Sequence, residues 1–292
     1  MSLRVFSTLL MAAILAWSGP ASAVPFFFST GDVDGRIATA SRPESPGKIE
    51  IESADDFVVS GGTLKLNSAT FQGLLPTGSS LNSVGTVRVE IYRVFPQDST
   101  NPPSGNVPTR VNSPSDVAFE SRESGGGGLT FTPGVIAGSF VAANSVLNGI
   151  NKIPNQTTGG EGPITGQKVQ FNVLFSTPIT LPADHYFFVP QVELPSGDFF
   201  WLSSVRPIVG PDGTPFAPDL QSWIRNGDLD PDWLRIGTDI VGGTMFNAAF
   251  TLDGELEPVP EPTTLLLWGS TMVGLGLTAH WRRRRQELVV AP

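Results

Sequence analysis

Short runs in which apolar and polar residues alternate recur along the middle of the chain. The clearest extends from Thr86 to Phe95 and sets Val87, Val89 and Ile91 against Arg88, Glu90 and Tyr92. Side chains of a β-strand point alternately to its two faces, so this pattern predicts a strand with one buried and one wet face. Comparable β-branched and aromatic runs predict further strands at Lys48–Val59, Thr63–Leu75, Val135–Ala142, Lys168–Phe175, Tyr186–Glu193, Asp198–Ser203 and Thr244–Leu252.

Helical periodicity is hard to find between these runs, and turn-forming residues are abundant, with 32 glycines and 26 prolines. Eight or more strands without helices to cover a parallel sheet predict an all-β fold, an antiparallel β-sandwich with a jelly-roll-like arrangement. Residues Pro96–Ser115 and Gly125–Gly128 are expected to be loops, and Gln221–Asn226 fits either a strand or one helical turn.

The first 23 residues have the layout of a secretory signal peptide. Arg4 precedes an apolar run from Val5 to Trp17, and small residues at Ala21–Ala23 offer a cleavage site after Ala23. A membrane anchor is the alternative, but the apolar run is shorter than the roughly 20 residues that a bilayer span requires. We therefore expect residues 1–23 to be removed during export.

A second apolar run, Leu265–Trp281, lies near the other end and is followed at once by Arg282, Arg283, Arg284 and Arg285. At about 1.5 Å per residue, a helix over this run would reach roughly 25 Å, close to the thickness of a bilayer core. Basic residues tend to stay on the cytoplasmic side, so the arginines would orient the preceding chain outward. The run and the arginines alone also fit a plain single-span anchor.

The motif Val259-Pro260-Glu261-Pro262 stands directly before this predicted helix. The motif, the short Leu-rich span and the arginine cluster, in this order, resemble the PEP-CTERM sorting signal of Gram-negative bacteria. The resemblance covers residues 258–292, and Gln286–Pro292 extend beyond the point where such signals usually stop. It implies processing by exosortase, a membrane-embedded cysteine transpeptidase, in bacteria that make an exopolysaccharide matrix.

The motif itself suits recognition by an enzyme. Each proline fixes φ and removes a backbone donor, so Glu261 is held in an extended segment outside any helix. A rigid linker would also explain the prolines, although not the basic residues that follow. We expect three parts in the chain: a signal peptide at 1–23, a β-sandwich domain at 24–257 and the sorting signal at 258–292.

The composition of residues 24–260 narrows the classes of partner. This segment holds 13 Lys and Arg against 25 Asp and Glu, a net charge of −12. Such an acidic surface argues against nucleic acid and anionic lipid as partners. The absence of cysteine excludes disulfides and thiolate chemistry, so stability must come from a hydrophobic core.

Few residues offer catalytic or metal chemistry. His185 is the single histidine between the two signals, at the head of a predicted strand, and there is no G-x-S-x-G motif, so no catalytic residue is predicted. One histidine and no cysteine exclude the usual zinc ligand sets. Carboxylates cluster at Asp32 with Asp34, at Asp55 with Asp56, and at Asp228, Asp230, Asp232 and Asp239.

The last of these clusters resembles the spacing of a calcium-binding loop, in which hard oxygen ligands converge on one ion. However, Trp233 stands where such loops need glycine, and turn aspartates commonly bond their own backbone. We expect no cofactor, with calcium at this cluster as the alternative.

Aromatic residues concentrate in the last third of the chain, and they include Trp201, Trp223 and Trp233. Exposed indole faces would form a platform for sugar rings, whereas buried ones would belong to the core. The favoured reading is a non-catalytic exported protein, held transiently in the inner membrane, processed by exosortase and retained at the cell surface or in the matrix. The alternatives are a carbohydrate-binding sandwich acting on extracellular polysaccharide and, with least support, a secreted hydrolase.

Overall fold

A computed structural model describes residues 22–95, 111–150, 157–209, 215, 218–243 and 245–258. Val24–Leu256 form one compact unit, which we call the body. The motif at 259–262, the expected helix at 265–281 and the arginines at 282–285 lie outside the described residues, as do residues 1–21 of the expected signal peptide. Within the described ranges, no helix has the length and apolar character needed to cross a membrane.

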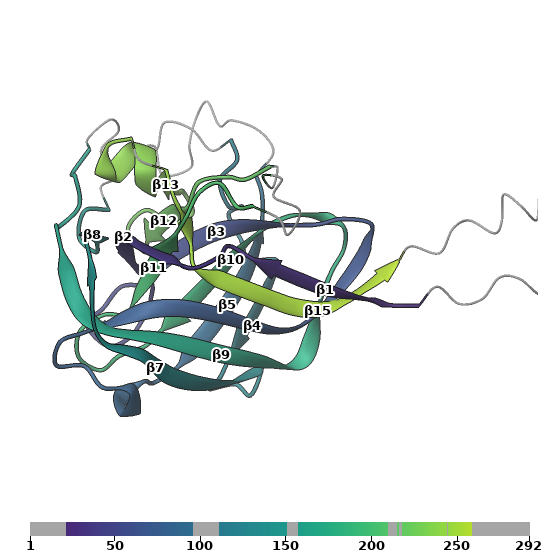
Figure 1. The fold of residues 1–292 in the computed structure, drawn as a ribbon, viewed down its shortest axis with the longest axis horizontal. Coiled ribbons are helices and arrows are strands. Elements are labelled where there is room, and N and C mark those ends of the chain that lie inside the picture. Colours follow the sequence, from purple (N-terminus) through teal and green to yellow (C-terminus); the bar gives the residue numbers. More distant parts are fainter. Residues whose placement is uncertain are drawn as a thin grey trace, which may run out of the picture. The chain divides into compact units, whose positions relative to one another are not determined.

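The body consists of two β-sheets (Figure 1). The nine-stranded sheet contains β1 Val24–Ser29, β2 Val33–Ala40, β4 Gly62–Pro76, β7 Leu129–Ala142, β8 Asn144–Val146, β9 Ile164–Leu181, β11 Phe200–Ser204, β14 Asn247–Ala248 and β15 Phe250–Pro258. The six-stranded sheet has the order β13 Leu234–Arg235, β12 Trp223–Asn226, β3 Ile51–Val59, β10 Asp184–Val192, β5 Val87–Arg93 and β6 Glu120–Glu123. A 3₁₀ turn at Leu81–Ser83 (η1) and a π-helix at Ile236–Val241 (η2) complete the described elements.

The all-β prediction is confirmed, and most of the expected strands are present. The Thr86–Phe95 pattern corresponds to β5, the Thr63–Leu75 run to β4, and the segment that fitted a strand or a helical turn is strand β12. Strands β1, β2, β6, β8 and β13 were not predicted. β2 ends in four consecutive buried residues, so its sequence lacks the alternation that marks a half-exposed strand.

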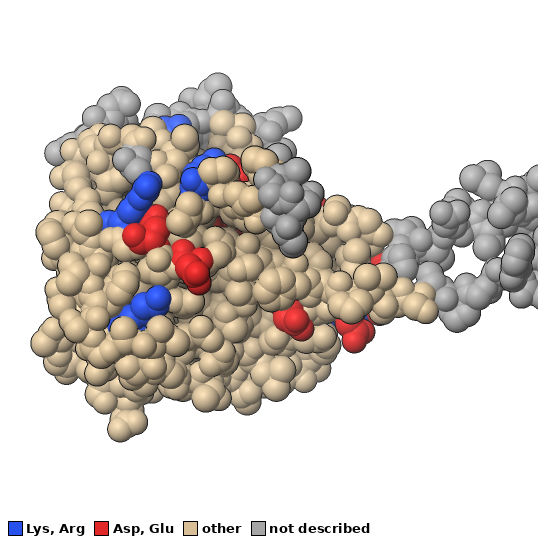
Figure 2. All heavy atoms as spheres, viewed as in Figure 1, with Lys and Arg blue, Asp and Glu red and all other residues tan. Residues whose placement is uncertain are grey.

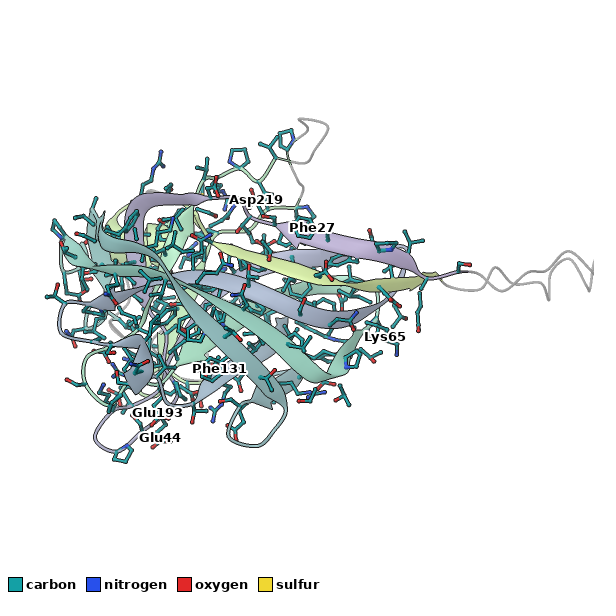
Figure 3. The ribbon with its side chains drawn as sticks, turned by 60° about the horizontal axis from the view of Figure 1, so that its bottom comes forward. Phe27, Glu44, Lys65, Phe131, Glu193 and Asp219 are labelled. Atoms are coloured by element: carbon teal, nitrogen blue, oxygen red, sulfur yellow. The ribbon has the colours of Figure 1, made fainter. Side chains whose placement is uncertain are left out.

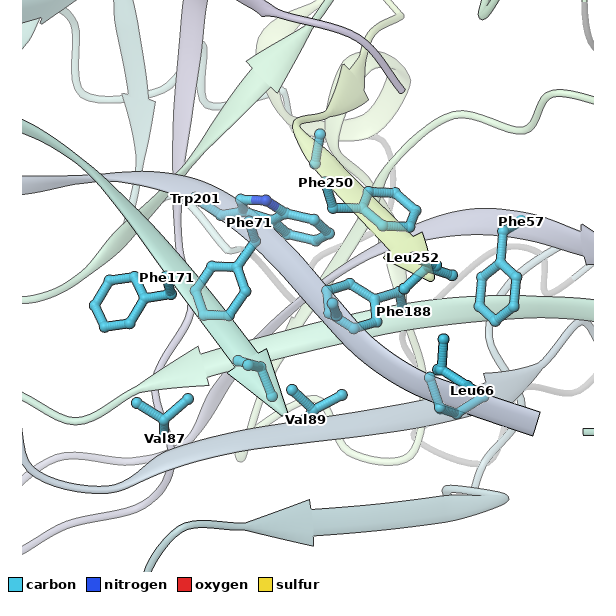
Figure 4. Packing of buried hydrophobic residues seen from close by; sticks show 14 of the residues in the cluster. Phe57, Leu66, Phe71, Val87, Val89, Phe171, Phe188, Trp201, Phe250 and Leu252 are labelled. Atoms are coloured by element: carbon cyan, nitrogen blue, oxygen red, sulfur yellow. The ribbon is translucent and has the colours of Figure 1, made fainter. Parts of the chain in front are cut away.

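Aromatic and aliphatic side chains from both sheets fill the space between them (Figure 4). Phe71 of β4 stacks on Phe171 of β9, with ring centroids 5.0 Å apart, and Phe188 of β10 stacks on Phe250 of β15 at the same centroid distance. Because each of the two sheets turns its apolar face inward, this layer of side chains holds the sheets face to face.

The outer faces of the two sheets differ. On the six-stranded sheet, Tyr92 is 3% exposed and packs in a small cluster with Phe187, Trp223 and Trp233. The expectation of a wet face for the Thr86–Phe95 strand is therefore wrong at Tyr92, because the chain around residues 115–118 and 229–233 covers that face.

The outer face of the nine-stranded sheet carries a row of short uncharged polar side chains across five adjacent strands. The row comprises Ser29 (β1), Thr251 (β15), Thr70 (β4), Asn172 (β9) and Thr132 (β7). Figure 2 shows few charged side chains where β4, β9 and β7 lie in front. Lys65 and the 69%-exposed Phe27, both labelled in Figure 3, belong to β4 and β1 of this sheet.

Candidate functional site

The covered outer face of the six-stranded sheet holds a dense group of charged and polar side chains. We call this group the arginine–glutamate network, and it consists of Glu50, Glu52, Arg88, Glu90, Tyr92, Gln191 and Arg225. Alternation along β3 and β5 brings its members to one face, and the neighbouring strands β10 and β12 supply Gln191 and Arg225.

At the buried end of the network, Arg225 faces Glu52, and the two side chains are 6% and 5% exposed. The Arg225 Nε group donates to Glu52, and its Nη2 group donates to the Tyr92 hydroxyl at 3.0 Å. The guanidinium also lies 4.4 Å from the ring centroid of Trp233 and 2.7 Å from Asp230. Arg225 thus ties β12 to β3, β5 and the covering segment.

The Tyr92 hydroxyl lies between two carboxyl groups. Its oxygen is 2.7 Å from Glu52 Oε1 and 3.0 Å from Glu90 Oε2. Burial, followed by the negative charges of Glu52 and Glu90, raises the pKa of Tyr92, so the phenol keeps its proton.

The more exposed end of the network contains Arg88, which lies 3.1 Å from Glu50 and 3.2 Å from Glu123 of β6. Gln191 donates to the Glu50 carboxylate at 2.7 Å. Burial raises the pKa of Glu50, and the hydrogen bond from Gln191 opposes this shift. Arg88 therefore connects β5 to β6 and to the residue directly before β3.

Asp55 and Asp56 of β3 point to opposite faces of the sheet. Asp55 is fully buried between the two sheets, where its carboxylate accepts from the Ser222 hydroxyl at 3.0 Å and from the Ala248 amide at 2.9 Å. Burial, followed by the charge of Asp56, raises the pKa of Asp55 well above its usual value. Asp55 thus connects β3 of one sheet to β14 of the other.

Asp56 lies on the outer face of the sheet, where its Oδ2 is 2.6 Å from His185 Nε2 and its Oδ1 accepts from the Leu220 amide at 3.0 Å. Burial raises the pKa of Asp56, and the interaction with His185 opposes this shift. Asp219, labelled in Figure 3, adds a further negative charge near both aspartates.

His185 stands at the head of β10, as the sequence predicts, but its ring is oriented by a buried carboxylate. This His–Asp pair has the geometry of an oriented general base. Among the described residues, no serine or threonine hydroxyl is bonded to the imidazole.

The four aspartates of the possible calcium loop are not brought together. Asp230 pairs with Arg225, and Asp239 accepts from the Arg235 guanidinium at 2.7 Å, so arginines hold two of the expected ligands. Asp232 is completely buried, whereas Asp228 is exposed. Within the described ranges, no group of three or more His, Asp or Glu side chains is placed to hold a metal ion.

The three tryptophans proposed as a sugar platform are all buried, and their exposed fractions are 1% for Trp201, 2% for Trp223 and 0% for Trp233. Trp201 lies in the layer between the sheets, and the other two lie under the cover of the six-stranded sheet. None presents a ring face to solvent, so the platform expected from these residues is absent. Their size and apolar surface serve packing instead.

The arginine–glutamate network was not predicted, although the sequence holds a signal for it. Glu50, directly before β3, and Glu52 of β3 share one parity, and Arg88, Glu90 and Tyr92 share one parity of β5. Each set predicts a polar face, and their complementary charges would have suggested that the two faces lie together, although β10 separates β3 from β5 in the sheet. The contribution of Arg225 depends on the pairing of β12 with β3. Arg225 and Glu52 are 173 positions apart in the sequence.

Comparisons with known proteins assign the chain to no group. No family model matches it, and no curated protein matches it. Among solved structures, the VP2 subviral particle of infectious bursal disease virus is 13% identical, with 94% of this chain and 56% of that chain covered and a TM-score of 0.16. The chain thus spans a little over half of the viral chain, and a similarity of this size supports no conclusion about fold or function.

Proposed function

We propose that this chain is an exported, non-catalytic protein of the cell surface or extracellular matrix, whose body is cargo carried between two processing signals. The observation behind this proposal is where the strands begin and end. β1 starts at Val24, directly after the predicted cleavage site at Ala23, and β15 ends at Pro258, directly before the Val259–Pro262 motif. The described strands therefore lie in the sequence between the two predicted signals.

The pairing of these two strands supports the same proposal. β1 and β15 run antiparallel from Val24 opposite Leu256 to Ser29 opposite Thr251. The first and last strands of the body are thus neighbours in one sheet. Cleavage before Val24 and after Pro258 would leave every described strand pair intact, so processing at either end is compatible with a folded body.

The use of the charged groups favours a structural role over catalysis. The buried acids of β3 bind main-chain amides, arginines and hydroxyl groups of the body itself. Such groups fix loops and strands, and their partners are already supplied. We also propose sorting by exosortase, a C-terminal helix and a jelly-roll-like arrangement. These three points rest on the sequence patterns alone.

The test is to replace Pro260, Glu261 and Pro262 with alanine in a producing strain. We expect the variant to keep its C-terminal segment and to accumulate in the membrane, because the extended recognition segment is lost. The matched control replaces Gln286, Glu287 and Leu288, which follow the arginines, and should be processed normally. Equal processing and surface delivery of the motif variant and the wild type would refute sorting through this motif.

A further inference from the structure

The Tyr92 hydroxyl has more carboxyl neighbours than it has protons. A phenol carries one hydrogen and can donate one hydrogen bond. Its oxygen lies 2.7 Å from Glu52 Oε1 and 3.0 Å from Glu90 Oε2, and both distances are those of hydrogen bonds. A second full hydrogen bond at this oxygen needs a hydrogen atom from another group, which a protonated carboxyl group would supply.

Arg225 cannot provide that missing hydrogen. Its Nη2 group donates to the phenol oxygen at 3.0 Å, and its Nε group donates to Glu52. The other oxygen of Glu90 accepts from the Ser121 hydroxyl at 2.9 Å. In these contacts the phenol oxygen and both carboxyl groups act as acceptors. If both acids are ionised, the two oxygen–oxygen contacts of Tyr92 with Glu52 and Glu90 share a single hydrogen atom.

We propose that Glu52 and Glu90 share one proton through the Tyr92 hydroxyl. The side-chain contacts that join β3, β5 and β12 would then depend on protonation. With the proton present, one acid donates to the phenol oxygen and the phenol donates to the other acid. Without it, two carboxylates face a single hydrogen in a covered site. The inference concerns the body alone and does not depend on the proposed function.

The buried environment of Glu52 favours its protonated form. Burial raises the pKa of Glu52, with the positive charge of Arg225 acting against this shift and the charge of Glu90 adding to it. Arg225 has a second counter-ion, Asp230, 2.7 Å away, so its charge is balanced when the pair holds a proton. Among the described residues, further charged groups near the pair include Glu50, which directly precedes β3, Arg88 on β5 and Glu123 on β6.

The pH dependence follows from the count of bound protons. An unfolded chain releases the Glu52 proton near pH 4 to 5, whereas burial raises the pKa of Glu52 in the folded state. The folded state then binds more protons than the unfolded state, so stability falls as pH rises through the titration of Glu52. In that window the folding equilibrium constant should fall by up to about tenfold per pH unit on account of this proton.

The experiment is ¹³C NMR of the purified protein labelled at the glutamate carboxyl carbon, at about pH 6.5, well above the ordinary glutamate pKa. We expect one resonance at the position of a protonated acid that is lost in both Glu52→Gln and Glu90→Gln. The control Glu50→Gln, which alters a neighbouring, partly buried acid that does not contact Tyr92, should retain it. If a variant fails to fold, the wild-type spectrum still decides. Absence of any protonated glutamate there, or its persistence in both variants, would overturn the proposal.

Discussion

In both sheets, alternate residues of a strand point to the outer face. The two outer faces differ in the side chains that these residues carry. On the six-stranded sheet the polar parity supplies arginines and glutamates that are covered and paired, with Arg225 6% exposed. On the nine-stranded sheet it supplies a row of Ser, Thr and Asn side chains beside solvent, without a described covering segment over β4, β9 and β7. Polar alternation therefore marks a face that is not the inter-sheet core, and the covering segments decide whether that face is wet.

Energetic expectations follow from this difference. A charge removed from water must find a partner, so loss of one partner leaves the other uncompensated. A short hydroxyl or amide group at the surface exchanges protein contacts for water at little cost. Substitutions on the two outer faces should therefore differ widely in their effect on stability.

The largest effect is expected for Arg225→Ala. This change leaves the buried Glu52 without its counter-ion and removes the guanidinium stacked on Trp233, so the free energy of unfolding should fall by about 3–5 kcal/mol. Urea unfolding followed by tryptophan fluorescence measures it. The control is Arg36→Ala, whose side chain is 63% exposed beside Asp34, and its cost should stay below about 1 kcal/mol. Equal costs for the two would remove the distinction between covered and exposed charges.

An intermediate effect, visible as pH dependence, is expected at Asp55. Its raised pKa means that the folded state keeps a proton that the unfolded state releases, so this group lowers stability as pH rises above about 4. Asp55→Asn removes that titration and should flatten the dependence of unfolding free energy on pH. Urea midpoints measured across the acidic to neutral range provide the comparison, with exposed Asp253→Asn as the control. A variant profile parallel to that of the wild type would contradict the assignment.

The smallest effect is expected on the nine-stranded outer face. Asn172→Ala and Thr132→Ala remove exposed side chains and should change the free energy of unfolding by no more than about 0.5 kcal/mol. The same urea titration applies. A loss above about 2 kcal/mol in either variant would show that this face is as tightly constrained as the covered one.

The sequence predicted strands that alternation or an aromatic run marks, and it missed β2, which has neither signal. Thr86–Phe95 alternates and was found, whereas Ile37–Ala40 of β2 are all buried and gave no pattern. A sugar-binding surface was considered for the tryptophans, because residue type alone does not distinguish exposed from buried indoles. The network could be foreseen in part from the acids of β3 and the residues of β5, but Arg225 is joined to them by long-range strand pairing.

We propose a folded cargo that lies between two removable segments. Intact-mass measurement of the protein recovered from the producing cells and their medium tests it most directly. We expect a mature species that begins at Val24, lacks the C-terminal apolar run and arginines, and weighs less than the 31.0 kDa of the whole chain. A surface or extracellular form that retains residue 1 and the arginine cluster at that full mass would contradict it.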